Sequence, residues 1–261
     1  MEPFTALVLA GRRAGADPLA ELHGVQHRAL LEVAGVPMLL RVVRALDQSK
    51  YVGRIVVSIG DPTALDDVPE LRSMVAAGAL ETHRSLDSPS RSVCDVLEGT
   101  AVGEKVLVTT ADHALLIREM VDHIAAAEDG ADVSVGFVSA TLLRTAYPES
   151  TRTYLRLRGE AWSGANLFAF RTERARRAAG WWVRAEAFRK HPWRLVAAFG
   201  PISLLLFALR RLDLAGAMRR VSRAVGAEVR AVPLPQAEAA IDVDRPSDLA
   251  LATRILEQRE R

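Results

Sequence analysis

Short runs of β-branched residues alternate with helical patterns along this chain, and this alternation limits its fold more than any other feature. Four runs are expected to be strands, at residues 5–10, 54–59, 105–110 and 132–138. Helical spacing of apolar residues lies between them at residues 37–46, 92–97 and 118–127. Strands that alternate with helices favour a parallel sheet with crossover helices. The sequence therefore predicts an α/β fold with a mostly parallel central sheet.

The second half of the chain adds a different pattern. Two strands are expected at residues 153–158 and 165–171, joined through residues 159–164 as a hairpin or as an addition to the edge of the sheet. A helix is expected over residues 214–225, because Asp213 can cap its start and Gly226 can end it. A strand at residues 228–234 and a helix at residues 247–258 close the chain.

Charge is distributed unevenly. The whole chain has 34 basic and 32 acidic residues, so no polycation exists to bind nucleic acid by neutralising phosphates, and no nucleic-acid partner is expected. Residues 174–226 alone hold twelve basic and two acidic residues. We interpret residues 172–226, approximately, as a basic helical insertion within a single domain that spans residues 1–261.

Several classes of protein are excluded by what the sequence lacks. The single cysteine, Cys94, excludes a disulfide framework and a cysteine-based zinc site. The six histidines form no His-Glu-x-x-His pair, and no Gly-x-Ser-x-Gly turn occurs, so zinc-enzyme and hydrolase interpretations lose support. The N-terminus has no basic region of a signal peptide, so a cytoplasmic location is expected.

The apolar stretch at residues 195–209 is interrupted by Gly200-Pro201 and is shorter than the roughly 18 residues that a spanning helix needs. Beside Trp181, Trp182, Trp193 and the neighbouring arginines, it suits a helix that lies in a membrane interface. Residues 181–211 therefore suggest a peripheral contact with the inner face of the membrane. The alternatives are an ordinary helical subdomain and a homodimer interface.

The turn after the first strand is a candidate anion site. Leu9, Ala10 and Gly11 let backbone N–H groups approach an anion, and Arg12 and Arg13 offer forked donors for phosphate oxygens. The turn has neither the Gly-x-Gly-x-x-Gly spacing of a dinucleotide site nor the Gly-Lys-Ser/Thr ending of a P-loop. The alternative is a tight surface turn.

Three aspartates are candidate ligands for a metal. Asp112 follows the strand at residues 105–110, at the end of the sheet where ligands of open α/β folds bind, and its alternative role is a helix cap. Asp242 and Asp244 point to the same side of an extended segment, where one can bind a metal while the other caps the next helix. Carboxylates suit Mg²⁺, which phosphoryl-type transfers require. A solvated acidic turn is the alternative for residues 242–244.

A hydroxyl-rich turn precedes the expected helix at residues 92–97. Ser90, Arg91 and Ser92 are able to hydrogen-bond a base or a ribose. Helix capping is the alternative role for this turn.

Taken in order, these pieces resemble the nucleotidyltransferases with a glycosyltransferase-A-type fold, in the branch of molybdenum cofactor guanylyltransferase-like NTP transferases. The pieces are the turn at residues 9–13, residues 26–38, Asp112, residues 163–168 and residues 241–249, and the similarity covers residues 4–170 and 228–256. The resemblance implies a Rossmann-like three-layer sandwich of the nucleotide-diphospho-sugar transferase type.

The resemblance also implies roles for individual residues. The nucleoside triphosphate would bind at Leu9, Ala10, Gly11, Arg12, Arg13, Arg28, Ser90, Arg91 and Ser92. Arg28 stands where the family has a phosphate-contacting lysine, and Arg12, Arg28 and Asp112 form the candidate catalytic group. Asp112 and Asp242 would hold Mg²⁺, with Asp244 as the second choice, and Gly164 and Asn166 match the acceptor-binding turn. The serines resemble the base-contacting stretch of methylerythritol-phosphate cytidylyltransferases, which favours CTP.

The function that follows from the resemblance is transfer of a nucleoside monophosphate from a nucleoside triphosphate to a phosphorylated small molecule or lipid precursor, with release of pyrophosphate. Two alternatives stay open. One is a glycosyltransferase that uses a sugar nucleotide on the same fold. The other is a nucleotide-binding protein without catalytic activity.

Overall fold

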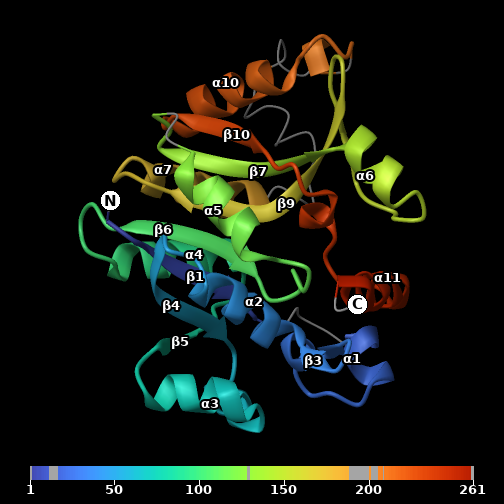
Figure 1. Cartoon of the computed structure of the whole chain (residues 1–261). Coiled ribbons are helices and arrows are strands. Elements are labelled where there is room, and N and C mark those ends of the chain that lie inside the picture. Colours follow the sequence, from blue (N-terminus) through green and yellow to red (C-terminus); the bar gives the residue numbers. More distant parts are fainter. Residues whose placement is uncertain are drawn as a thin grey trace.

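An eight-stranded sheet forms the centre of the molecule in the computed structural model (Figure 1). The structure describes residues 2–11, 17–127, 130–187, 200, 205–207 and 209–259. Seven strands follow in the spatial order β10 (Val229–Pro233), β7 (Val133–Ser139), β9 (Ala161–Phe170), β6 (Lys105–Thr110), β1 (Phe4–Leu9), β4 (Val52–Ile59) and β5 (Leu80–Arg84). Strand β9 is antiparallel to its neighbours β6 and β7, and the other pairs along this path are parallel.

Helices cover both faces of the sheet, which completes a three-layer α/β sandwich. In β1, Phe4, Ala6 and Val8 face one apolar core while Leu7 faces the other, as the alternation of side chains in a strand requires. The larger core takes its apolar side chains from α1 (Pro18–Leu22), α2 (Met38–Asp47), α3 (Pro69–Ala76), α5 (Arg118–Ala126), α6 (Ala140–Ala146) and α11 (Pro246–Arg259). The second core takes them from α4 (Pro89–Gly99), α7 (Ala175–Ala187) and α10 (Leu214–Val225).

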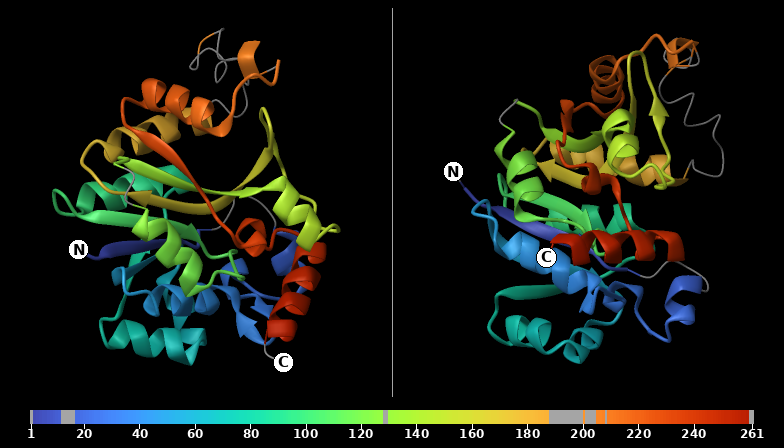
Figure 2. Two further views of the ribbon diagram at one scale, coloured as in Figure 1. Left: turned by 45° about the horizontal axis from the view of Figure 1, so that its top comes forward. Right: turned by 45° about the vertical axis from the view of Figure 1, so that its right-hand side comes forward.

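Short elements complete the fold near the carboxyl end of β1. They are the 3-10 helices η1 (Arg28–Leu30), η2 (Pro62–Asp67) and η4 (Ala237–Ala240), and the small ribbon of β2 (Glu32–Val33) and β3 (Val36–Pro37). Figure 2 shows the C-terminal helix α11 close to the N-terminal segments that follow β1, although they are far apart in the sequence. The two ends of the chain therefore build one region of the molecule.

The predicted Rossmann-like α/β architecture is confirmed, and two elements match their predicted bounds. These are β6 and α10, where the Asp213 carboxylate accepts from Gly216 N at 2.7 Å and Gly226 adopts a left-handed φ of 72°. Strand β5 and helix α3 were not predicted. In β5 only Leu80 is buried, because the strand lies at the edge of the sheet and presents charged side chains to solvent.

The prediction for residues 153–171 is partly wrong. The turn lies at residues 157–160, where Gly159 has a φ of 88°, and β9 already begins at Ala161. Residues 162–164 pair with β7, and this pairing extends the strand through the segment expected to be a turn. The two-residue strand β8 (Leu155–Arg156) pairs with the start of β9 alone, and β9 lies inside the sheet instead of at its edge.

Helices α7 and α10 of the basic segment pack on the sheet. Ala175 and Ala179 of α7 and Met218 and Val225 of α10 are buried in the second core. The ring of Trp182 lies 5.5 Å from that of Phe168 in β9, so this tryptophan packs within the protein. Trp193 and most of residues 188–204 lie outside the described residues. Within the described part of the chain, no helix has the length and apolarity needed to cross a membrane.

Candidate active site

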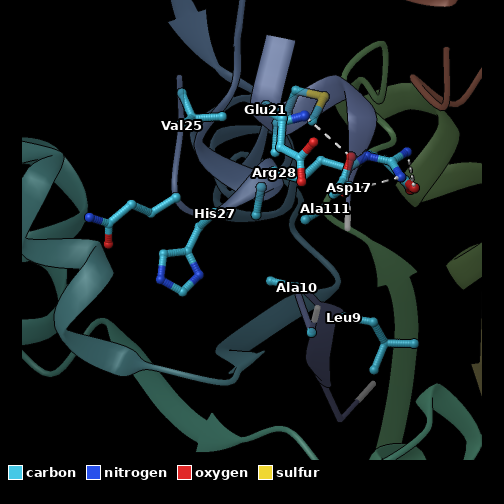
Figure 3. A pocket seen from close by; sticks show the side chains of 14 residues that line it. Leu9, Ala10, Asp17, Glu21, Val25, His27, Arg28 and Ala111 are labelled. Carbon is cyan, nitrogen blue, oxygen red and sulfur yellow. Dashed lines mark hydrogen bonds and ion pairs between the residues drawn. The ribbon is translucent and has the colours of Figure 1, made fainter. Parts of the chain in front are cut away.

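A cavity of about 290 Å³ opens at the carboxyl ends of β1 and β6 (Figure 3). Its walls come from the end of β1, the segment from α1 to η1, the start of α2 and the turn after β6. The lining residues are Leu9, Ala10, Gly11, Asp17, Ala20, Glu21, Val25, Gln26, His27, Arg28, Ala29, Met38, Ala111 and Asp112. Ligands of open α/β sheets bind at this end of the strands, so the cavity is the candidate active site.

The turn after β1 forms one wall of the cavity. Leu9, Ala10 and Gly11 all line it, as predicted for the nucleotide site. A Cβ on Gly11 would lie 3.2 Å from both Cβ and Oγ of Ser85, so this position needs glycine for the close approach of the loop that follows β5. Arg12 and Arg13 lie outside the described residues.

Arg28 connects three carboxylates at the wall of the cavity. Its guanidinium donates to Asp244 Oδ1 at 2.6 Å, to the carbonyl of Val243 at 2.5 Å and to Asp112 Oδ2 at 3.3 Å, and Asp17 Oδ2 lies 3.9 Å away. Burial works to lower the pKa of Arg28, but the hydrogen bond to Asp244 and the surrounding negative charges raise it. Arg28 is therefore a fixed cation, and its forked donors are well suited to phosphate oxygens.

Asp112 meets the C-terminal segment at the end of β6. The N–H of Val243 donates to the carbonyl of Asp112 at 2.9 Å, which places Asp242 and Asp244 next to it. Asp112 does not cap the next helix, because α5 begins only at Arg118, with Ile117 at its N-cap. Fold contacts thus bring together carboxylates that are 130 residues apart in sequence.

Asp242 is nearly buried and incompletely bonded. Its side chain accepts from Asn166 Nδ2 through Oδ2 at 2.7 Å, while Oδ1 is buried without a hydrogen-bond partner among the described residues. Burial raises the pKa of this carboxyl well above its usual range, and the charge of Asp112 raises it further, against the opposing effect of Arg152. Two carboxylates that repel each other in a buried site favour the presence of a cation.

The residues present fit a magnesium ion held by two carboxylates. The unbonded Asp242 Oδ1 is an available hard oxygen ligand, and Asp112 is its neighbour. Asp244 is committed to Arg28. No group of three or more ligating side chains is arranged around a metal position in the described part of the chain, so water and substrate oxygens would complete the coordination.

A bulge in β9 directs Asn166 to Asp242. The pairing of β7 with β9 shifts register between Val135 and Phe137, and Asn166 adopts a φ of 45° there. Bulges of this kind turn a side chain toward a site, and asparagine tolerates the left-handed conformation better than most residues. Gly164, the other predicted acceptor residue, is exposed on the same strand, with open space around its α-carbon.

The predicted base-contacting serines lie away from the cavity wall. Ser88 caps α4, and the fully buried hydroxyl of Ser90 donates to Glu186 of α7. Ser92 Oγ accepts from the N–H of Leu86 at 2.9 Å, and Arg91 is exposed near Asp87. Both serine hydroxyls are thus used inside the fold, and the cap of α4 is Ser88.

Sequence reasoning did not single out Asp17, His27, Arg152 and Asp248. Arg152 is buried and donates to the carbonyl of Asp242 at 2.7 Å and to Asp248 Oδ1 at 2.9 Å. Asp248 Oδ2 accepts from the N–H groups of Asp244 and Arg245, so this residue of the first turn of α11 holds the segment that enters the helix, and the carboxylate of Asp244 pairs with Arg28. These isolated residues form no motif. The sequence signal that was available is Asp17-Pro18, a typical helix start.

Comparisons with known proteins agree with this geometry. The family model of the MobA-like NTP transferase domain matches residues 6–228. No curated protein matches the chain. A hypothetical transferase structure from Thermus thermophilus is 31% identical, with a TM-score of 0.78, and the match covers 95% of this chain and 100% of that one.

Two more distant structures share the fold. CMP:2-keto-3-deoxy-manno-octonic acid synthetase, solved in complex with CTP, has a TM-score of 0.59 at 14% identity, covering 98% of this chain and 99% of that one. A 2-C-methyl-D-erythritol 4-phosphate cytidylyltransferase from Thermus thermophilus has a TM-score of 0.56 at 16% identity, covering 98% of this chain and 100% of that one. From the family match, which spans most of its length, the chain belongs to the MobA-like NTP transferase family and is a nucleotidyltransferase.

Proposed function

We propose that this protein transfers a nucleoside monophosphate, with CTP as the favoured donor, to a phosphorylated acceptor and releases pyrophosphate in a reaction that depends on Mg²⁺. The observation that carries the proposal is the buried, incompletely bonded Asp242 next to Asp112, which lines the cavity together with Arg28. It combines a cation for phosphate oxygens with two carboxylates for a metal.

The chain's own residues have distinct tasks in this reaction. Backbone N–H groups of the turn after β1 and the guanidinium of Arg28 would bind the triphosphate. Asp112 and Asp242 would hold Mg²⁺, which when bound offsets the charge that develops on the phosphates. Asn166 fixes the orientation of the Asp242 carboxylate through its 2.7 Å hydrogen bond.

Little acid–base chemistry is required of the protein. An oxygen of the acceptor phosphate attacks the α-phosphorus, and the bond from this phosphorus to the bridging oxygen breaks, so pyrophosphate leaves. The attacking oxygen is already ionised near pH 7, so alignment and charge stabilisation suffice. The exposed Gly164 and the neighbouring Asn166 border the side from which we expect the acceptor to enter.

The preference for CTP and the nature of the acceptor are inferred from the names of the two distant structures. Both distant structures are named for cytidylyl chemistry, one being solved with CTP and one named for a phosphorylated sugar alcohol. Both names support a cytidine nucleotide, and the second supports a phosphorylated small-molecule acceptor here.

The test is pyrophosphate release by the purified protein with Mg²⁺ and each of ATP, CTP, GTP and UTP, together with a pooled extract of phosphorylated metabolites and lipid precursors. We expect release with one triphosphate, and mass spectrometry of the product would identify the acceptor. Consumption of a sugar nucleotide in place of a triphosphate would show a glycosyltransferase. Triphosphate binding without turnover over a broad acceptor panel would show a binding protein.

Variants at the carboxylates test the metal site. Asp112→Asn and Asp242→Asn are each expected to abolish turnover while the protein remains folded. Asp67→Asn is the matched control, because Asp67 is exposed in η2 away from the cavity. Near-normal activity in either site variant would remove that residue from the proposed metal site.

A further inference from the structure

The outer side of α10 carries two arginines, Arg219 and Arg223, that have no acidic partner among the described residues. Arg219 and Arg223 are exposed one helical turn apart, and with Arg174 they line a shallow hollow beside the end of α10. None of these three arginines forms an ion pair with another described residue. Within the described part of the chain, this group of charges is therefore available to an external anion.

Two acidic residues share the hollow, but both have other partners. The carboxylate of Asp132 accepts from the hydroxyl of Thr172 and from the N–H of Glu228. Glu228 pairs with Arg230 at 3.3 Å. With Glu228 offset by Arg230, three arginines lie in the hollow with the single charge of Asp132, so its net charge is positive.

An apolar turn lies directly before α10 in the sequence. The side chains of Leu205, Phe207 and Leu209 are 58%, 40% and 54% exposed. Seven large apolar side chains are exposed among the described residues, and three of them lie within these five residues. Single exposed apolar residues are ordinary, but such a concentration indicates a contact surface.

The apolar turn leads along the chain into the arginines of α10. Arg210 and Arg211, both exposed, follow the turn, and the next residue, Leu212, borders a hollow together with Arg219 and Arg223. In Figures 1 and 2 this end of the molecule lies far from α3, on the opposite side of the sheet from that helix. We name Arg174, Arg219, Arg223, Arg210 and Arg211 with Leu205, Phe207 and Leu209 the docking face.

We propose that the docking face binds the surface of an anionic lipid bilayer. Headgroup phosphates would accept from the guanidinium groups, and the three apolar side chains would enter the boundary between headgroups and acyl chains. A nucleic acid would satisfy the charges but leave the apolar side chains in water. Lipid is the partner that matches both components of the face.

This proposal does not rest on the nucleotidyl transfer proposed above. The docking face includes none of the residues that line the candidate active site. A failure of either proposal would leave the other standing. A protein bound to a bilayer would nevertheless meet a lipid-precursor acceptor directly.

The test is co-sedimentation of the full chain with vesicles of phosphatidylcholine, alone or mixed with phosphatidylglycerol. We expect binding to the mixed vesicles only, with a decrease at higher salt. Neutralising two arginines in Arg219→Gln/Arg223→Gln should lower the partition coefficient about 25-fold, since each basic residue near an anionic surface contributes about a fivefold factor. Leu205→Ser/Leu209→Ser should also weaken binding.

Matched controls lie on other surfaces. Arg72→Gln in α3 removes an exposed arginine at the opposite end of the molecule, and Val102→Ser removes the most exposed large apolar side chain. Both should bind vesicles like the unmodified protein. Unchanged thermal unfolding of all four variants would show that the folded state is kept.

Three results would overturn the proposal. One is equal recovery in the supernatant with and without phosphatidylglycerol, and another is unchanged sedimentation of the double arginine variant. The third is binding to a DNA duplex that depends on Arg219 and Arg223 but not on Leu205 and Leu209, because this would identify a nucleic-acid surface.

Discussion

At the scale of single residues, Arg28 determines the electrostatics of the candidate active site. Its Nη2 donates to Asp112, Asp244 and the carbonyl of Val243, while Nη1 lies 3.9 Å from Asp17, so the two ends of one guanidinium reach different carboxylates. The chain has three lysines among its 34 basic residues, so arginine carries nearly all of its cationic interactions. The arginine at this position is therefore suited to both its carboxylate partners and a phosphate.

We predict a graded effect of substitutions at Arg28. Arg28→Ala should lower kcat/KM for pyrophosphate release by about 10- to 150-fold, the equivalent of one lost charge-assisted hydrogen bond. Arg28→Lys should fall between this variant and the unmodified protein, because the charge remains while the fork is lost. Arg254→Ala, on the exposed side of α11, is the control. An unaffected rate in Arg28→Ala would show that this side chain does not contact the reacting phosphates.

His113 provides a prediction for the dependence of stability on pH. Burial lowers the pKa of this fully buried imidazole to about 4, and Arg152 contributes in the same direction. The unfolded chain binds the proton near pH 6.5 and the folded protein only near pH 4, so stability is lost as the pH falls through this interval. Between pH 7.5 and pH 5 this group alone should cost about 2 kcal/mol.

Urea unfolding of His113→Phe at both pH values, in the presence of a chelator, isolates this effect. The unmodified protein should lose about 2 kcal/mol more stability than the variant over the same interval. An equal loss in the two proteins would mean that His113 is protonated as readily in the folded protein as in the unfolded chain.

At the scale of secondary-structure elements, the bulge between β7 and β9 positions Asn166 beside Asp242. Gly136 lies opposite the bulge, and a Cβ there would approach Leu234 Cδ1 to 3.1 Å, the carbonyl oxygen of Leu167 to 3.2 Å and Ala165 Cβ to 3.3 Å. One of these atoms belongs to the backbone and cannot move alone. The absence of a side chain at Gly136 thus permits the turn that directs Asn166 to Asp242.

Gly136→Ala is predicted to lower the free energy of unfolding by about 1–3 kcal/mol, the usual effect of overpacking. It should lower pyrophosphate release as well, because the displaced bulge moves Asn166 away from Asp242. Gly180→Ala in α7 is a control with the opposite sign, since open space surrounds Gly180 and alanine favours a helix. Unchanged stability in Gly136→Ala would show that β7 and β9 can move apart with little loss of free energy of unfolding.

The sequence predicts some helices and strands accurately and misses others. The apolar strand β6 and the capped helix α10 carry complete local signals, and both were predicted within their bounds. Edge strand β5 carries no such signal, because Glu81 and Arg84 face solvent. At the site, strand ends and family order predict Arg28 and Asp112, whereas Arg152 and Asp248 become visible only as a buried pair in the fold.

At the scale of the whole molecule, the site joins the two ends of the chain. Val243 is bonded on both sides, since its N–H donates to Asp112 and its carbonyl accepts from Arg28. The segment that carries Asp242 and Asp244 is thereby linked to the turn after β6 and to η1. A ligand that binds only when these three segments are in contact stabilises that contact. Binding at the cavity should therefore reduce local unfolding of all three segments together.

Hydrogen exchange read by mass spectrometry tests this coupling. With CTP and Mg²⁺, peptides covering residues 241–245 and residues 111–113 should gain protection together, whereas the peptide of α3 should not change. Without ligand, Arg28→Ala should raise exchange at residues 243–244, because the carbonyl of Val243 and the carboxylate of Asp244 lose their donor. Protection confined to the turn after β1 would mean that the triphosphate binds without the C-terminal carboxylates, and the metal would then have to be held by Asp112 alone.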